Sequence, residues 1–203
     1  MITAALIGNP NCGKTTIFNK LTGSIQKVGN WAGVTVERKQ GYVRNFTDEK
    51  ILVVDLPGIY SLSPYSPEEI VSRDFLIGSS EEKPDVAVCI IDASSLERSM
   101  YLFSQVADMG IPTVVVVNMI DVALDRGITI DQSKLQKTLG CEVVMSIGTK
   151  AHGIDQIAGA IKRAKDAGTV PNTITYDARL EEAISGISSI LDGTVRDDLV
   201  RWA

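Results

Sequence analysis

Short hydrophobic runs alternate along this chain with longer segments in which apolar residues recur every three to four positions. The short runs are rich in β-branched residues and predict strands, whereas the spaced segments predict amphipathic helices. The predicted strands cover residues 2–7, 40–46, 50–55, 85–92, 113–118 and 142–145. The predicted helices cover residues 14–21, 67–77, 96–109, 131–139 and 154–167. Strands that are apolar throughout are typical of a mostly parallel sheet covered on both faces, so we predict a doubly wound α/β fold with helices flanking the sheet.

Two regions depart from simple alternation. Residues 40–46 and 50–55 are joined by a short polar turn, which predicts an antiparallel hairpin at one edge of the sheet. After Gly168, residues 171–175 have the composition of a linker. A short C-terminal helical appendage is expected beyond it, with a second helix starting near Thr194. Its first apolar face comprises Leu180, Ala183, Ile184, Ile187 and Leu191. The predicted domains are therefore 1–167 and 168–203.

Composition narrows the classes of function. The chain has 203 residues with 44% hydrophobic residues, and its 20 Lys and Arg against 25 Asp and Glu give a formal net charge of −5. This acidic balance argues against nucleic acid as a partner. The three cysteines are far apart and predict reduced thiols in a cytosolic compartment. We expect a soluble segment, since neither a signal peptide nor a membrane-spanning stretch is recognisable.

Residues 8–15, Gly-Asn-Pro-Asn-Cys-Gly-Lys-Thr, fit the phosphate-binding P-loop pattern G-x-x-x-x-G-K-S/T. They lie between a predicted strand and a predicted helix, as the motif requires. Backbone N–H groups of the loop and the helix N-terminus favour a bound anion. Lys14 is expected to reach the β- and γ-phosphates, and the Thr15 hydroxyl to bind Mg²⁺. The predicted phosphate site comprises Asn9, Pro10, Asn11, Cys12, Gly13, Lys14, Thr15 and Thr16.

Two further motifs each follow a predicted strand. Residues 55–58 fit D-x-x-G, in which Asp55 is expected to hold Mg²⁺ and the Gly58 N–H to meet the γ-phosphate. Residues 118–121, Asn118 to Asp121, fit N-x-x-D, whose carboxylate accepts both N1–H and the exocyclic amine of guanine. Adenine offers neither donor there, so a buried Asp121 would be left unpaired at a cost of about 1–3 kcal/mol. These motifs predict GTP or GDP as the ligand.

The order of P-loop, Thr35, D-x-x-G and N-x-x-D is similar to that of small GTPases. Within it, residues 28–37 and 55–69 resemble the two switch regions of the FeoB family, prokaryotic ferrous iron transporters with an N-terminal cytosolic G domain. The resemblance covers residues 1–165, and the tail resembles the start of the helical (GDI-like) spacer that leads to the membrane channel. It implies a GTPase domain at the cytoplasmic face of the bacterial inner membrane, partnered by the channel portion of the same protein. A homo-oligomer is compatible with it.

The resemblance also implies individual roles. Thr35 is the switch I threonine, whose hydroxyl would bind Mg²⁺ and whose backbone would bind the γ-phosphate, with Gly33 and Val34 beside it. Asn11 matches the asparagine of potassium-stimulated GTPases, and K⁺ held there would neutralise charge between the β- and γ-phosphates as an arginine finger does. The implied catalytic group is Asn11, Lys14, Thr35 and Gly58.

The sequence departs from the usual patterns at Ile59, at Met119, in the base-capping loop, and at Ala32, where the family usually has proline. Ile59 follows the D-x-x-G motif, where Ras-type enzymes use a water-orienting glutamine, so unassisted hydrolysis is expected at about 10⁻³ s⁻¹ or slower. Met119 replaces the lysine common in N-K-x-D. The base-capping loop has Gly148, Thr149 and Lys150 in place of Ser-Ala-Lys. The Thr149 N–H would meet guanine O6 and Lys150 would cover the ring, but the missing serine predicts weaker affinity and faster GDP release.

Other interpretations stay open at this point. A ribosome-assembly or tRNA-modifying GTPase shares the motifs, although the acidic balance and the lack of a basic appendage disfavour it. A nucleotide-binding module with negligible turnover is compatible with Ile59. Cys12 lies near a predicted helix N-terminus, which lowers the pKa of a thiol, so a redox role is an alternative to a small loop residue.

Overall fold

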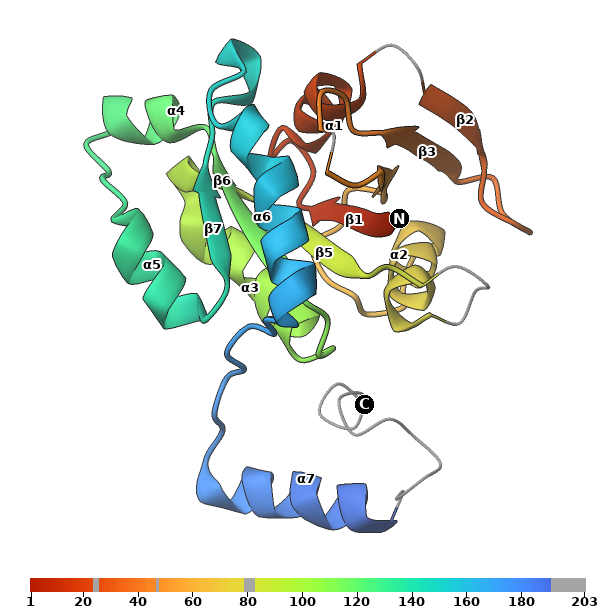
Figure 1. Ribbon diagram of the computed structural model, residues 1–203. Helices are drawn as coiled ribbons and strands as arrows, with labels where there is room; N and C mark the ends of the chain where they lie inside the picture. The colour runs from red at the N-terminus through yellow and green to blue at the C-terminus, as the bar shows by residue number, and fades with distance from the viewer. Residues whose placement is uncertain (24–25, 47, 79–82, 191–203) are drawn as a thin grey trace.

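The computed structural model describes residues 1–23, 26–46, 48–78 and 83–190. Within these residues one seven-stranded sheet has the order β2-β3-β4-β1-β5-β6-β7 (Figure 1). The strands are β1 (Ile2–Gly8), β2 (Gln26–Asn30), β3 (Glu37–Tyr42), β4 (Ile51–Asp55), β5 (Val86–Asp92), β6 (Thr113–Asn118) and β7 (Glu142–Met145). The five strands from β4 to β7 in this order pair in parallel, whereas β2–β3 and β3–β4 are antiparallel.

Helices cover both faces of the sheet. The helices are α1 (Lys14–Thr22), α2 (Pro67–Ile77), α3 (Leu96–Ala107), α4 (Ile120–Asp125), α5 (Gln132–Leu139), α6 (Ile154–Ala167) and α7 (Ala178–Ile190), with short 3₁₀ turns η1 (Ala93–Ser95) and η2 (Gly148–Lys150). One core cluster joins α1 and α6 to alternate strand residues such as Leu6, and the other joins α2, α3 and α5 to their neighbours such as Ile7. Both faces of each central strand are therefore buried, which confirms the doubly wound α/β prediction.

The predicted strands at 2–7, 50–55, 85–92, 113–118 and 142–145 and the five predicted helices are confirmed with small shifts at their ends. At the antiparallel edge, the predicted pairing of residues 40–46 with 50–55 is confirmed as β3–β4, but the prediction placed this pair at the edge and set the bounds of β3 too late. The strand predicted at 40–46 is β3, which ends at Tyr42, and the outermost strand β2 was missed. Val28 is the only large apolar residue of β2 and is exposed, so this edge strand is held by backbone pairing and carries no buried periodic pattern. The six-residue helix α4 was missed as well.

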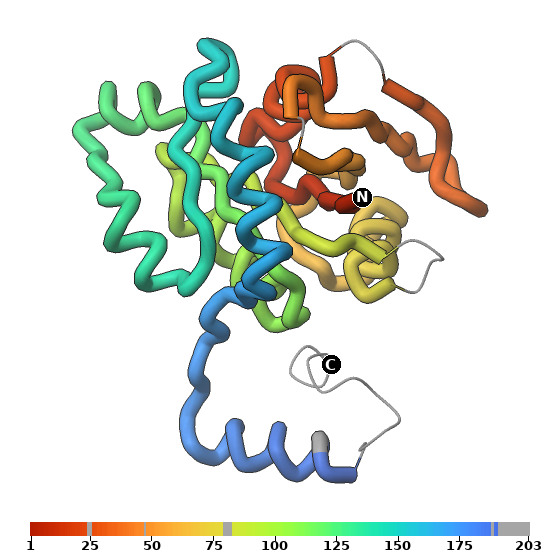
Figure 2. Tube along the Cα trace, in the orientation of Figure 1, coloured from red at the N-terminus to blue at the C-terminus, as the bar shows by residue number. Residues whose placement is uncertain are grey.

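The C-terminal helix α7 follows an extended segment and lies apart from the α/β layers (Figures 1 and 2). It confirms the first predicted appendage helix, and its apolar residues Leu180 and Ile187 are exposed. Leu191 and the helix expected from Thr194 lie outside the described residues. In the described part of the chain, no helix has both the length and the apolar character needed to cross a bilayer.

Candidate nucleotide site

The loop between β1 and α1 depends on two glycines that permit close approach of other groups. A Cβ at Gly8 would lie 2.6 Å from the Ile90 carbonyl oxygen and 2.8 Å from Cys12 Sγ. Gly13 has a left-handed φ of 86°, and a Cβ there would lie 2.2 Å from Asn118 Nδ2. Any side chain at either position would displace backbone or the Asn118 amide, so packing requires both glycines.

This loop borders an open cavity of about 550 Å³ at the carboxyl edge of the sheet. Ligands of open α/β sheets bind at this edge, where the strands end and the helices begin. Gly58 and Met119 complete the border. The lining residues are Asn9, Pro10, Asn11, Gly13, Lys14, Thr15, Thr16, Gly58 and Met119. The structure thus brings together the predicted phosphate-binding residues, with the exception of Cys12, whose side chain is buried in the core beneath α1.

Lys14 and Asp55 form a buried ion pair beside this cavity. The Lys14 ammonium donates a hydrogen bond to Asp55 Oδ1, and both residues are less than a tenth exposed. Burial raises the pKa of the Asp55 carboxyl, and the Lys14 charge opposes that shift without cancelling it. The two charged groups predicted for phosphate and Mg²⁺ therefore lie in contact, and each is the other's counter-charge.

Asn118, the last residue of β6, links two loops of the site. Its Nδ2 donates to the Cys12 carbonyl oxygen at 2.9 Å, and its Oδ1 accepts from the Gly148 N–H at 2.9 Å. The side chain is almost fully buried. The sequence predicted that Asn118 belongs to a base-binding motif. The two hydrogen bonds by which its side chain links the P-loop to the predicted base-capping loop are visible only in the folded chain.

Asp121 and Lys150, the two residues predicted to contact the base, are paired with each other. Lys150 Nζ lies 3.2 Å from Asp121 Oδ2, and Asp121 Oδ1 accepts the Val122 N–H. Desolvation acts to raise the pKa of Asp121, but the hydrogen bonds from Lys150 and from the Val122 N–H, together with the Lys150 charge, outweigh it, and the pKa lies below its usual range. Asp121 was expected to be buried. Its side chain is instead 30% exposed.

The switch I residues Gly33, Val34 and Thr35 do not line the phosphate cavity. They form the turn between β2 and β3, which is closed by a hydrogen bond from the Trp31 N–H to the Val36 carbonyl oxygen at 2.9 Å. Thr35 is exposed there, so its predicted contacts with Mg²⁺ and the γ-phosphate require this turn to move.

Trp31 anchors the same turn from the inside. Its ring packs edge-on against Phe75 of α2, with ring centroids 5.3 Å apart, and the Arg38 guanidinium lies 4.7 Å from its centroid. The side chain is buried, although the sequence pattern around it is polar. A single large aromatic residue between Gly29 and Gly33 could have predicted a buried contact at this position, but the sequence analysis did not make that prediction.

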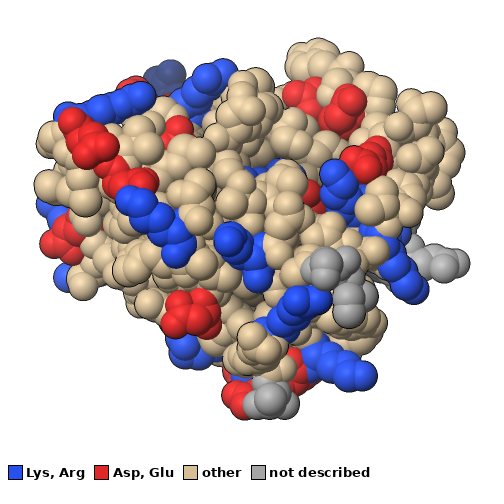
Figure 3. Space-filling model, turned by 90° about the horizontal axis from the view of Figure 1, so that it is seen from above, with Lys and Arg blue, Asp and Glu red and all other residues tan. Residues whose placement is uncertain are grey.

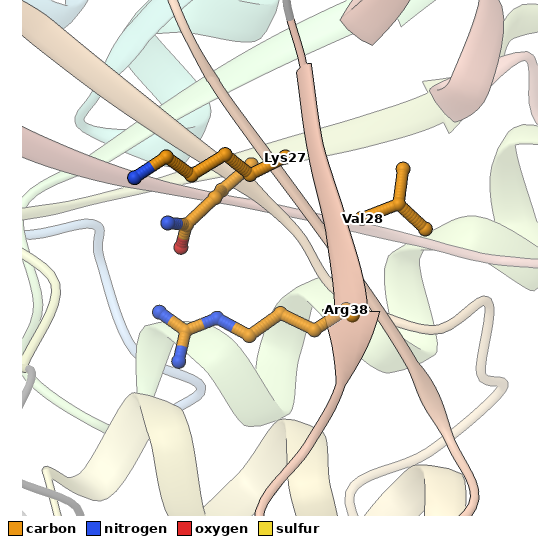
Figure 4. Close-up of a pocket in the computed structure, with 5 residues that line it drawn as sticks. Lys27, Val28 and Arg38 are labelled. Atoms are coloured by element: carbon orange, nitrogen blue, oxygen red, sulfur yellow. The ribbon is translucent and has the colours of Figure 1, made fainter.

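A second, smaller cavity of about 200 Å³ lies on the β2–β3 hairpin (Figure 4). The Lys27 and Arg38 side chains extend to the same side of the hairpin, whereas Val28 points to the other (Figure 4). None of its lining residues belongs to the phosphate cavity. It is therefore a feature of the hairpin and separate from the nucleotide site.

Charge is mixed on the face seen from above in Figure 3, where basic and acidic side chains are interspersed. At the phosphate cavity itself, the groups that favour an anion are the Lys14 ammonium and the N–H groups at the N-terminus of α1, which has no acidic residue in its first turn.

The thiol of Cys12 differs from the expectation for a helix N-terminus. Burial raises its pKa to about 11, and the hydrogen bond and charge of Lys14 do not compensate. The thiol is therefore protonated at neutral pH, which is contrary to an activated thiolate. The interpretation of Cys12 as a small, buried loop residue is the one that fits.

The P-loop, the D-x-x-G glycine and the sheet order define a P-loop NTPase of the G-domain class. The family model described as "Ferrous iron transport protein B" matches residues 2–161, and the chain belongs to this family. It is 46% identical over 206 residues to the Fe(2+) transporter FeoB of Escherichia coli (strain K12), covering 99% of this chain and 26% of that protein. The chain thus spans about a quarter of the length of such curated relatives.

Solved structures agree with the assignment. The chain has a TM-score of 0.91 and 44% identity to a point variant of S. thermophilus NFeoB bound to GDP. Its TM-score to the same variant bound to GDP·AlF₄⁻ is 0.84, again at 44% identity. Each match covers 100% of this chain and 77% of the other.

Lys14→Met is expected to lower the free energy of unfolding of the nucleotide-free protein by about 3 kcal/mol at pH 8, because the buried Asp55 carboxylate loses its counter-charge. The loss should shrink toward pH 5. A raised carboxyl pKa favours the folded state below it and costs stability as pH rises through it. Urea unfolding at both pH values measures this, and Lys14→Met combined with Asp55→Leu should recover most of the loss. An equal loss of stability at both pH values would contradict the claim that Lys14 stabilises the ionised Asp55 carboxylate.

Gly148→Ser is expected to fit and to slow GDP release by about three- to tenfold, the worth of one added hydrogen bond. A Cβ at Gly148 would lie 3.4 Å from Asn118 Oδ1 and 3.4 Å from Ile17 Cγ1, which is ordinary contact. A serine hydroxyl could therefore donate to Asn118. Stopped-flow release of fluorescent GDP measures the rate, and Gly148→Ala is the matched control. Equal slowing by both variants would assign the effect to packing.

Proposed function

We propose that this chain is the GTP-binding and GTP-hydrolysing domain of a prokaryotic ferrous iron transporter. The observation that carries the proposal is the convergence of three motifs at one sheet edge. The P-loop and Gly58 share one cavity with Met119, and Asn118 fastens that loop to the segment that holds Lys150. Such a site serves a phosphorylated guanine nucleotide.

The phosphate end of the site has the chemistry that a triphosphate needs. A bound nucleotide would draw the Lys14 ammonium from Asp55 to the β- and γ-phosphates. Asp55 and Thr15 then present a carboxylate and a hydroxyl oxygen, the hard donors that suit Mg²⁺. When bound, Mg²⁺ supplies charge neutralisation on the phosphate oxygens. The buried carboxylate beside the cavity fits this ion, because burial disfavours its ionised form without a cation nearby.

The base end of the site supports guanine. Asp121 is ionised, and a guanine placed between Asp121 and Lys150 would offer two N–H donors to the carboxylate. The Lys150 stem would cover one side of the ring, and the Met119 side chain borders the other end of the cavity. The Thr149 N–H is assigned to guanine O6. Lys150 is two-thirds exposed, so it can exchange its ion pair for contact with the base at little cost.

Hydrolysis in this site lacks the usual glutamine. Ile59 occupies that position, and its side chain is buried in the core on the α2–α3 side. It cannot orient a water molecule, so we infer slow unassisted turnover that K⁺ accelerates. Asn11 lines the cavity and is the proposed K⁺ ligand. Its φ of 66° also fits a loop-stabilising role, and the experiment on Asn11 below separates the two.

The γ-phosphate is proposed to reorganise switch I. Thr35 lies in the exposed β2–β3 turn, so its Mg²⁺ contact forms only after the turn moves over the cavity. In the full-length protein the attached membrane channel is the proposed partner, at the cytoplasmic face of the inner membrane, with residues 168–203 as the start of the helical spacer. The family match favours this over a ribosomal or tRNA-linked role. The burial of Ile59 favours a binding module with negligible turnover as the second candidate.

Asp121→Asn is expected to weaken GDP binding by at least tenfold while leaving the fold intact, because an amide repels one of the two guanine N–H donors. The variant should bind xanthosine diphosphate better than wild type does, since that base presents an acceptor in place of the amine. Isothermal titration with GDP, XDP and ADP measures all three. Unchanged GDP affinity would contradict guanine recognition by Asp121.

Asn11→Gly is expected to abolish stimulation of GTP turnover by KCl over NaCl without weakening GDP affinity. Glycine keeps the left-handed backbone but removes the side-chain oxygen. Phosphate release at saturating GTP in the two salts measures the effect. Asn11→Ala tests the loop role, because it adds backbone strain as well. Equal wild-type turnover in both salts would contradict the K⁺ proposal, and no turnover in either would favour the binding-module candidate.

A further inference from the structure

Part of the second switch region (switch II, residues 55–69) is fastened to one face of α3. The Leu62 N–H donates to Gln105 Oε1 at 2.8 Å, and the Arg98 guanidinium carbon lies 4.2 Å from the centroid of the Tyr60 ring. Arg98 and Gln105 are seven residues apart, so they lie on the same side of the helix two turns from each other. Two α3 side chains therefore hold two points of the segment that directly follows Gly58.

The same helix also contacts the phosphate loop, because Asn9 Nδ2 donates a hydrogen bond to the Arg98 carbonyl oxygen at 3.4 Å. Switch II contacts this loop directly as well, through a hydrogen bond from the Ile59 N–H to the Gly8 carbonyl oxygen at 3.3 Å. Asn9, Tyr60 and Arg98 all line one polar cavity of about 160 Å³. Arg98 thus contacts the P-loop through its backbone and switch II through its guanidinium.

We propose that Arg98 and Gln105 are positioning residues that hold switch II in an arrangement that cannot bind a γ-phosphate, and so set the ratio of GTP affinity to GDP affinity. The proposal rests on the proposed nucleotide function. Gly58 can turn its N–H toward a γ-phosphate only together with residues 59–62, and those are the residues that α3 holds.

The direction of the effect follows from a two-state equilibrium. If a γ-phosphate is bound well only when switch II is released, the apparent GTP affinity is reduced by the fraction of molecules in that state. GDP has no γ-phosphate and binds both arrangements alike. A variant that removes one anchor raises the released fraction, and GTP affinity rises by the same factor. A residue that only stabilised the fold would weaken both nucleotides instead.

The test compares GDP with the non-hydrolysable analogue GMPPNP, both with Mg²⁺, by isothermal titration. Arg98→Ala and Gln105→Met should each tighten GMPPNP binding by about threefold, the worth of an exposed cation–π contact or one hydrogen bond. GDP affinity should stay within about 1.5-fold of wild type. Arg98→Lys keeps a cation over the ring and Gln105→Glu keeps an acceptor for the Leu62 N–H, so both controls should resemble wild type.

Substitutions of Tyr60, the partner of Arg98 in the cation–π contact, test the same proposal independently. Tyr60→Ala should tighten GMPPNP binding as Arg98→Ala does, and the double variant should gain no more than either single one. Tyr60→Phe keeps the ring and should resemble wild type. In steady-state turnover, the anchor variants should show a lower KM for GTP at unchanged kcat.

The outcomes separate the two proposals. GMPPNP affinity that stays equal or falls in Arg98→Ala and Gln105→Met, with GDP binding retained, overturns the positioning role. A parallel loss for both nucleotides does so too, since it indicates a structural role alone. Absence of binding of either nucleotide to the wild-type protein overturns the proposed function itself.

Discussion

The side-chain amide of Asn118 is the interaction on which the rest of the site depends. Its two hydrogen bonds tie the P-loop to the base-capping loop, and both run through a buried position at the end of β6. A buried amide of this kind is costly to leave unpaired. The P-loop and the loop of residues 148–150 are therefore held in one fixed relation, and a side chain at Gly13 would collide with this amide.

The two switches are built differently. Switch I is an edge hairpin whose turn exposes Thr35 and is held by the packing of Trp31 on Phe75. Switch II (residues 55–69) has Ile59 buried in the core but is fastened to α3 by single contacts at Tyr60 and Leu62. Single contacts at a half-exposed surface are weak. The loops linked by Asn118 are held by buried hydrogen bonds, whereas the switch segments are held by weak contacts. A ligand can change only the weakly held segments, because it can shift an equilibrium by no more than its difference in affinity for the two states.

The elements predicted correctly are those whose local pattern of apolar residues reflects their burial. Residues 2–7 and 113–118 are apolar throughout because both faces of a central strand are buried, so periodicity and burial agree there. The edge strand β2 escaped notice because backbone hydrogen bonds hold it and Val28 is exposed. Two environments were also misjudged. Cys12 has a raised pKa because burial outweighs the charge and hydrogen bond of Lys14, and Asp121 is partly exposed although it was expected to be buried.

The sequence by itself determined the fold class, the position of the phosphate loop and the motifs that predict guanine. These depend on spacing within short segments and on which faces are apolar, and both are local properties. Only the tertiary structure decided that Lys14 pairs with Asp55, 41 residues away, and that Asn118 bonds to Cys12, 106 residues away. The contact of Arg98 with Tyr60 is of the same kind. Such pairs arise when separate strand ends converge at one edge of a sheet, and local spacing does not encode which side chains meet there.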